Sequence, residues 1–159
     1  MDQYRTLLLD VWREACRHIE IAESTANIAA MLQPFVPIQQ LLVRRFDWER
    51  NVVETVATGM SDPASLPTEV RSECSAAQKR AVLAWSGEGR LLHVGHVSNV
   101  PDRETQAIAA GSIIPAGMKG AAVAGPLGEP GSPSGAVVLA GADGAAFEPR
   151  HLDLADLLL

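Results

Sequence analysis

The sequence predicts an α+β domain in which a central antiparallel β-sheet of five to six strands is flanked by helices. Two observations lead to this prediction. Segments with helical or strand periodicity follow one another in the order helix, helix, strand, strand, helix, strand, helix, strands, helix. The chain has 159 residues, 47% of them hydrophobic, which fits one folded domain with an ordinary core.

The first element is an amphipathic helix near the N-terminus. Apolar residues recur every three or four positions and form one stripe: Tyr4, Leu8, Val11, Trp12, Ala15 and Ile19. We therefore divide the chain into an N-terminal helix, residues 1–19, and a domain, residues 20–159. A second helix is expected to begin at Ser24 or Thr25, which are good N-cap residues, and to end before Pro34.

Residues 38–46 and 52–58 predict a β-hairpin. Both segments are rich in β-branched and bulky side chains, and the polar stretch 47–51 between them is typical of a turn. Gly59 is expected to end the second strand, because glycine weakens a strand interior.

The middle of the chain predicts a helix, a short strand and a further helix. Pro67 marks the expected start of the first helix and Gly87 and Gly89 its end. The apolar residues between them have helical spacing: Val70, Cys74, Ala77, Ala81 and Trp85. Residues 91–94 then predict a strand and residues 101–111 a helix.

Residues 111–146 hold nine of the thirteen glycines but only three charged residues. We expect short strands at 112–116, 120–126 and 134–140, with a loop at 127–133. A last helix is expected to begin at Pro149 and to carry these apolar residues: Leu152, Ala155, Leu158 and Leu159.

This layout resembles a GAF domain, the small-molecule-sensing module of signalling proteins, over roughly residues 20–159. The resemblance lies in the opening helix, the first strand, the turn into the middle strand, two later strands and the final helix: residues 24–32, 40–47, 87–93, 112–115, 134–139 and 147–155. It implies a sensory or regulatory domain that binds a small molecule and takes part in signal transduction.

Residues 9–18 are similar to the start of a narrower group, the N-terminal GAF domains of transcription regulators that work with the sigma-54-type (nitrogen-type) sigma factor. In that group an ATPase domain and a DNA-binding domain follow the sensor. The sequence contains no Gly-x-x-x-x-Gly-Lys-Ser/Thr phosphate loop. The resemblance therefore implies a sensor piece whose last helix is truncated and whose output domain is absent from this chain.

Composition and motifs argue against several other classes of function. A net charge of −6 does not suit a nucleic-acid-binding surface, and no apolar run is long enough to predict a membrane span, so we expect a cytoplasmic protein. His93 and His96 lack further metal ligands, and on a strand they would point to opposite faces. We therefore predict no metal site.

The two cysteines bear on whether the chain is an enzyme. Some GAF proteins reduce free methionine sulfoxide with several cysteines around the pocket, whereas Cys16 and Cys74 both fall on predicted helices. We predict no catalytic residues. The predicted function is a non-catalytic sensor; the alternatives are a dimerisation module without ligand and, less favoured, a free methionine sulfoxide reductase.

The resemblance places a ligand pocket over the sheet, although it leaves the ligand and any cofactor unidentified. The residues that we expect to line this pocket are Trp85, His93, Arg103 and Lys119. Trp85 would form a wall, and Arg103 would pair with an anionic ligand; the alternatives are an ordinary core position and a solvated charge at a helix start.

The apolar stripe of the first helix and the apolar end of the last helix predict an interface. Exposed apolar stripes tend to become contacts between molecules. We expect a homodimer formed through both ends of the chain, with these interface residues: Leu8, Val11, Trp12 and Leu158. The alternative is a monomer in which the first helix packs on its own sheet.

Overall fold

A computed structural model describes residues 2–15, 21–60, 70–94, 111–115, 121–141 and 147–159. Within these ranges the strands form one six-stranded antiparallel sheet in the order β3-β2-β1-β6-β5-β4. Their bounds are β1 Ile38–Asp47, β2 Val52–Met60, β3 Arg71–Glu73, β4 Leu92–Val94, β5 Ala122–Glu129 and β6 Ser132–Gly141. The predicted α+β class with a central antiparallel sheet is confirmed.

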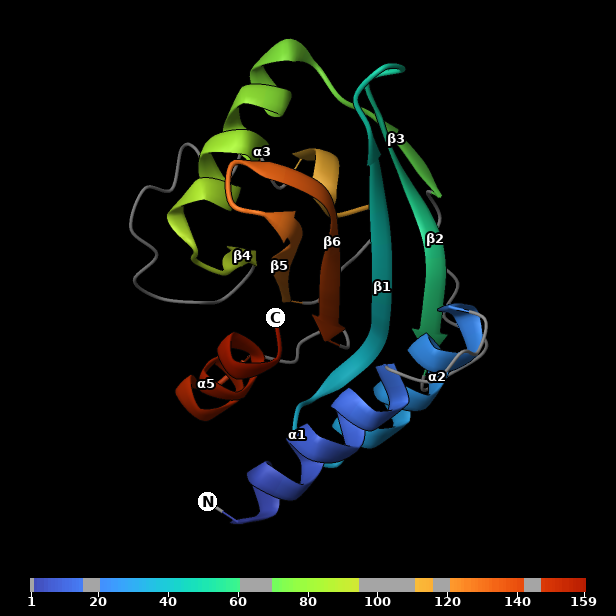
Figure 1. Cartoon of the computed structure of the whole chain (residues 1–159), viewed down its shortest axis with the longest axis vertical. Coiled ribbons are helices and arrows are strands. Elements are labelled where there is room, and N and C mark those ends of the chain that lie inside the picture. The colour runs from blue at the N-terminus through green and yellow to red at the C-terminus, as the bar shows by residue number, and fades with distance from the viewer. Residues whose placement is uncertain (1, 16–20, 61–69, 95–110, 116–120, 142–146) are drawn as a thin grey trace.

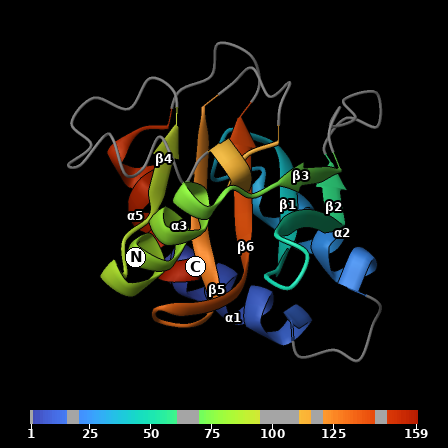
Figure 2. The same ribbon diagram turned by 90° about the horizontal axis from the view of Figure 1, so that it is seen from above.

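Helices cover both faces of the sheet (Figures 1 and 2). Three of them, here called the terminal helices, lie together on one face: α1 Asp2–Ala15, α2 Ile21–Leu32 and α5 Pro149–Leu158. The other face carries α3, Ala76–Glu88, which packs on β5 and β6, and the helical residues 111–113. We call the two sides the terminal-helix face and the α3 face.

The central strand β1 supplies both halves of the core because its side chains alternate between the faces. Leu42 and Phe46 pack in the cluster on the α3 face, whereas Leu41 packs with the terminal helices. A β-bulge in β2 interrupts the pairing, since Val43 lies opposite Ala57 while the next β1 residue already lies opposite Thr55. The bulge changes which β2 side chains face each layer.

The prediction that a helix begins at Pro67 is wrong, because the helix begins later. Residues 71–73 instead form the edge strand β3, and Ser75 is the N-cap of α3. The Ser75 hydroxyl accepts a hydrogen bond from Gln78 N at 3.1 Å, and Ser75 N donates to Gln78 Oε1 at 2.9 Å. This capping box is visible in the sequence as Ser-x-x-Gln, and it outweighs the apolar spacing that placed Val70 and Cys74 inside the helix.

Two expectations for the glycine-rich region are also wrong. Residues 111–113 are helical, so the strand expected at 112–116 is absent there. The loop expected at 127–133 is mostly a hairpin in which β5 and β6 continue to Glu129 and Ser132, with Gly131 at φ 77° in the turn. Glycine accepts this left-handed conformation without strain, which permits the tight connection.

Helix α2 begins earlier than expected, and Thr25 is an interior residue rather than its N-cap. Its hydroxyl donates to the carbonyl of Ile21 at 2.6 Å. Gly59 does not end β2 but lies inside it, where the α2 backbone comes closest to the sheet. A Cβ added at Gly59 would lie 2.5 Å from Thr25 O and 2.7 Å from Ala29 Cβ. The absence of a side chain therefore sets how closely α2 packs on β2.

This contact gives a stability prediction. Gly59→Ala is expected to lower the free energy of unfolding by about 1–3 kcal/mol, because a backbone carbonyl of α2 must move to admit the methyl group. The matched control is Gly87→Ala in α3, where the nearest atom to an added Cβ is 3.9 Å away. That variant is expected to gain about 0.5–1 kcal/mol. Urea unfolding measures both, and equal midpoints for the two variants would contradict the close approach.

Candidate ligand-binding site

The α3 face contains a buried arginine. Arg44 on β1 has no exposed surface, and its guanidinium donates hydrogen bonds to four oxygen atoms. These are Ser72 Oγ at 2.6 Å, Thr55 Oγ1 at 2.7 Å, the Val70 carbonyl at 3.1 Å and the Ser112 carbonyl at 3.3 Å. We call Arg44, Thr55, Ser72 and Ser112 the Arg44 cluster. It connects β1 with β2, with β3 and with the helical residues 111–113.

The neighbouring strand leaves room for this long side chain. Arg44 pairs with Thr55 on one side and with Ala136 of β6 on the other. Ala136, Ala122 and Ala124 are all buried in the cluster on the α3 face. Small side chains here leave the guanidinium among polar atoms in a layer that is otherwise apolar. The guanidinium is thus held by oxygen atoms of the chain itself.

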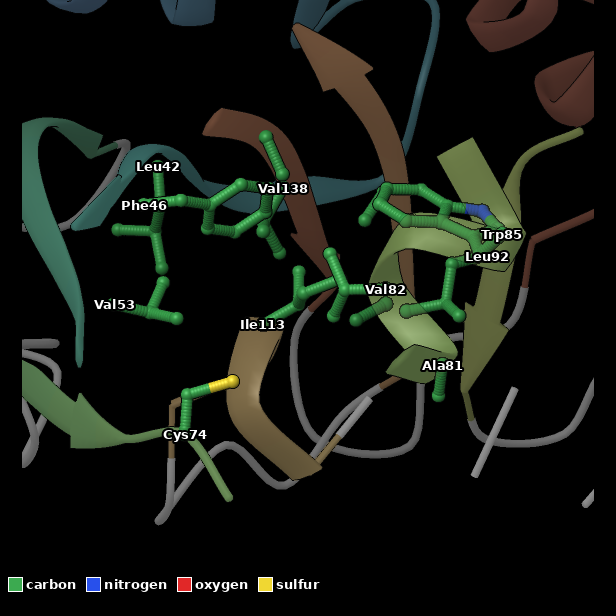
Figure 3. Close-up of a cluster of buried hydrophobic side chains, with 13 residues drawn as sticks. Leu42, Phe46, Val53, Cys74, Ala81, Val82, Trp85, Leu92, Ile113 and Val138 are labelled. Carbon is green, nitrogen blue, oxygen red and sulfur yellow. The ribbon is translucent and has the colours of Figure 1, made fainter. Parts of the chain in front are cut away.

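Cys74 borders the Arg44 cluster. Its side chain is buried, and its sulfur points toward the helical segment that carries Ile113 (Figure 3). Burial raises the pKa of the Cys74 thiol, while a hydrogen bond with the Ser112 side chain and the charge of Lys79 act in the opposite direction. The net effect favours the protonated thiol, which is a poor nucleophile.

Trp85 lies beside Leu92 in the hydrophobic cluster of the α3 face, at the opposite end from Cys74 (Figure 3). It is 1% exposed, and within the part of the chain that the structure describes its Nε1 has no hydrogen-bond acceptor. A buried donor without an acceptor costs about 1–3 kcal/mol. This is one of the predicted pocket residues, and an acceptor atom placed beside it would remove that cost.

His93 lies on the other face of the sheet. It pairs with Val123, which packs with the terminal helices, whereas its neighbour Leu92 packs on the α3 face. Burial lowers the pKa of the half-buried His93 imidazole. The structure therefore does not bring His93 and Trp85 together.

The remaining predicted pocket residues, Arg103 and Lys119, lie outside the described residues, as does His96. Among the residues that are described, no three His, Cys, Asp or Glu side chains gather closely enough to hold a metal ion. In the same ranges, no helix is long and apolar enough to cross a membrane.

The terminal-helix face contains a cavity of about 220 Å³ between the sheet and the terminal helices. Its floor includes the cross-strand pairs Val43–Val137 and Leu41–Leu139 of β1 and β6. The described residues that line it are aliphatic except for one threonine: Val11, Thr25, Ile28, Leu32, Leu41, Val43, Leu127, Val137, Leu139, Leu158 and Leu159. The cavity is therefore a place where a ligand has room to bind.

The predicted interface residues are partly occupied within their own chain. Val11 and Leu158 are half-buried, pack against the core of the terminal-helix face and line its cavity. Leu8 is also half-buried, and the side chain of Trp12 lies outside the described residues. The most exposed apolar side chains on the terminal helices are others: Leu9 at 57%, Ile21 at 54% and Leu157 at 63%.

Sequence reasoning did not single out the Arg44 cluster or the cavity. Arg44 lies two residues from Leu42 and two from Phe46, so strand alternation puts all three on one face. An arginine at an inward position of a central strand was therefore the signal available. The cavity had no such signal, because it depends on how the terminal helices meet the sheet.

Comparisons with known proteins identify solved structures with a similar fold. No family model matches the sequence, and no curated protein matches it significantly. Three solved structures each match 98% of this chain. The nlh2 GAF domain of A. aeolicus is 12% identical, with a TM-score of 0.55 over 86% of its length. The GAF domain of a phosphoenolpyruvate-protein phosphotransferase from Coxiella burnetii is 10% identical, with a TM-score of 0.60 over 88%.

The third is the free methionine-R-sulfoxide reductase of Neisseria meningitidis, 18% identical, with a TM-score of 0.62 over 83% of its length. Likenesses at this level of identity concern the fold alone. The chain has a GAF-like fold, as its sequence layout predicted.

The buried arginine leads to a testable contrast between neighbours. Arg44→Met is expected to lower the free energy of unfolding by about 2–5 kcal/mol, because it leaves buried oxygen atoms without donors. Arg45→Met is the matched control, since the Arg45 side chain is 60% exposed and forms a surface ion pair with Glu54 at 2.9 Å. Its loss should cost less than about 1 kcal/mol. Thermal and urea unfolding measure both, and similar losses would contradict a structural role for Arg44.

Proposed function

We propose that this chain is a non-catalytic sensory or regulatory domain that binds a small molecule on the α3 face and relays binding through the terminal helices. The observation that carries the proposal is that side chains of β1 take part in both faces of the sheet. Arg44 projects into the polar cluster on one face, while Leu41 and Val43 support the terminal helices on the other. A ligand that shifts β1 would change the packing of those helices.

The ligand chemistry follows from the groups on the α3 face. Among the described residues Trp85 Nε1 has no acceptor, and the alanines of the sheet leave an apolar surface beside it. We propose a small molecule that has an apolar part and at least one hydrogen-bond acceptor. Arg103 and Lys119 are proposed as further polar contacts.

The proposed setting is a cytoplasmic signalling protein, in the narrower form a sigma-54-type transcription regulator. Residues 1–19 would then form the dimerisation and signalling helix, and an output domain with ATPase and DNA-binding functions would receive the signal. Support for this form comes from the resemblance of residues 9–18.

The alternatives have less support. A dimerisation module without ligand would leave the buried indole donor of Trp85 without an acceptor among the described residues. A methionine sulfoxide reductase that works by thiol exchange needs neighbouring thiols. Cys74 is the only cysteine among the described residues, and burial raises its thiol pKa. Cys16 lies outside those residues.

The ligand proposal is tested with the purified chain. Native mass spectrometry is expected to show a retained small molecule, or a metabolite screen to find one that raises Tm. Trp85→Phe should weaken its binding about tenfold, the effect of losing one buried hydrogen bond. Trp48→Phe is the control, because Trp48 Nε1 already donates to the Pro133 carbonyl at 3.3 Å. Equal affinity in both variants would count against the α3 face, and the absence of any ligand against the sensor.

The dimer is tested separately. We expect a homodimer through the terminal helices, with Leu9 and Leu157 exposed at 57% and 63% as contact residues in addition to those predicted from sequence. Leu9→Glu and Leu157→Glu should each shift light-scattering masses toward the monomer. Val70→Glu is the matched control, since Val70 is 58% exposed but precedes β3, away from these helices. A monomer at all concentrations would refute the dimer.

A further inference from the structure

The cavity on the terminal-helix face is hydrophobic, and its described lining residues require no hydrogen bond from a ligand. Among the described lining residues Thr25 is the one with a polar side chain, and its hydroxyl is already used in the hydrogen bond to Ile21 O at 2.6 Å. None of the described lining residues is charged. Aliphatic walls offer a water molecule few hydrogen-bond partners, which favours an apolar occupant over water.

The shape of the cavity follows from two close contacts beside it. Gly59 lets the α2 backbone approach β2, and Leu159 packs over Gly125 of β5, where a Cβ would overlap it. Between these contacts the floor is formed by the short side chains of Val43 and Val137, which lie opposite each other on β1 and β6. Both valines are only half-buried although they face the terminal helices. The helices are therefore held at a distance that the valines do not fill.

The volume defines the size of a ligand. The cavity measures about 220 Å³. An engineered cavity of about 150 Å³ with similar aliphatic walls binds benzene. A single aromatic ring with a small substituent, a fused bicyclic ring or a short hydrocarbon chain is the matching size, whereas a charged or strongly polar molecule would lose its hydration without compensation.

We infer that this cavity binds a small uncharged hydrophobic molecule and that the bound molecule contacts α1 and α5 directly, through Val11 and Leu158. The site lies across the sheet from the Arg44 cluster and does not depend on the sensory function proposed above. Occupancy would fix the position of two terminal helices against the sheet, because both would then pack on the same ligand.

Toluene and indole are the probes, used with the full chain. Each is expected to raise Tm by about 3–5 °C at ten times its Kd. Methyl NMR should show the largest shifts at Val43, Val137 and Leu158. Val137→Phe, which fills the floor, should reduce toluene affinity at least about tenfold without lowering Tm in the absence of toluene. Val56→Phe is the matched control on β2, where the side chain is 37% exposed and not in the cavity wall, and it should keep wild-type affinity.

Val11→Phe fills the cavity from the helix side and replaces Val137→Phe if that variant does not fold. No change in Tm or in the methyl spectrum would overturn the proposal. Unchanged toluene affinity in the cavity-filling variant would also overturn it. The same holds if the methyl shifts are largest at Leu42 and Val82 of the α3 face. If toluene affinity falls as the chain self-associates, the cavity is occupied by a second copy of the chain, and the proposal is overturned. Failure here leaves the Trp85 test unaffected.

Discussion

The burial of Arg44 is the constraint on which the arrangement of the α3 face depends. A guanidinium group with no exposed surface must be surrounded by hydrogen-bond acceptors, because a buried charge without them costs more than a domain's net stability. The acceptors come from β2, from the β3 region and from residues 111–113. Strand β3 has three residues and few ladder bonds of its own, so Ser72 and the Val70 carbonyl contribute to holding it at the edge of the sheet.

The sheet separates two environments of different chemistry. On the α3 face, hydroxyl groups, an arginine and an indole donor lie among alanines and valines. On the terminal-helix face the described residues give the cavity aliphatic walls and one hydroxyl, which is already hydrogen-bonded. A polar ligand and an apolar ligand would therefore be sorted to opposite faces. Strand β1 belongs to both layers, so a displacement on either face reaches the other through neighbouring residues of one strand.

The terminal helices are tightly fixed in two places and loosely packed between them. Gly59 allows backbone contact between α2 and β2, and Gly125 admits Leu159. Between these two contacts, the short side chains of Val43 and Val137 do not fill the space under the helices, and the cavity remains. Protein interiors resist deformation where they are closely packed. Of the three terminal helices, α1 is the one that neither of these two glycine contacts holds.

The sequence by itself determined the α+β class, the GAF-like layout, the hairpin of β1 and β2, and the apolar stripe of α1, because these depend on periodicity and turn residues within short segments. It also contained the capping box of Ser75, which was missed in favour of apolar spacing. Only the tertiary structure decided that Trp85 and His93 occupy opposite faces, that Arg44 is buried and that a cavity lies under the terminal helices. The face on which a strand residue lies depends on register, bulges and partners that are distant in the sequence, and no local pattern encodes them.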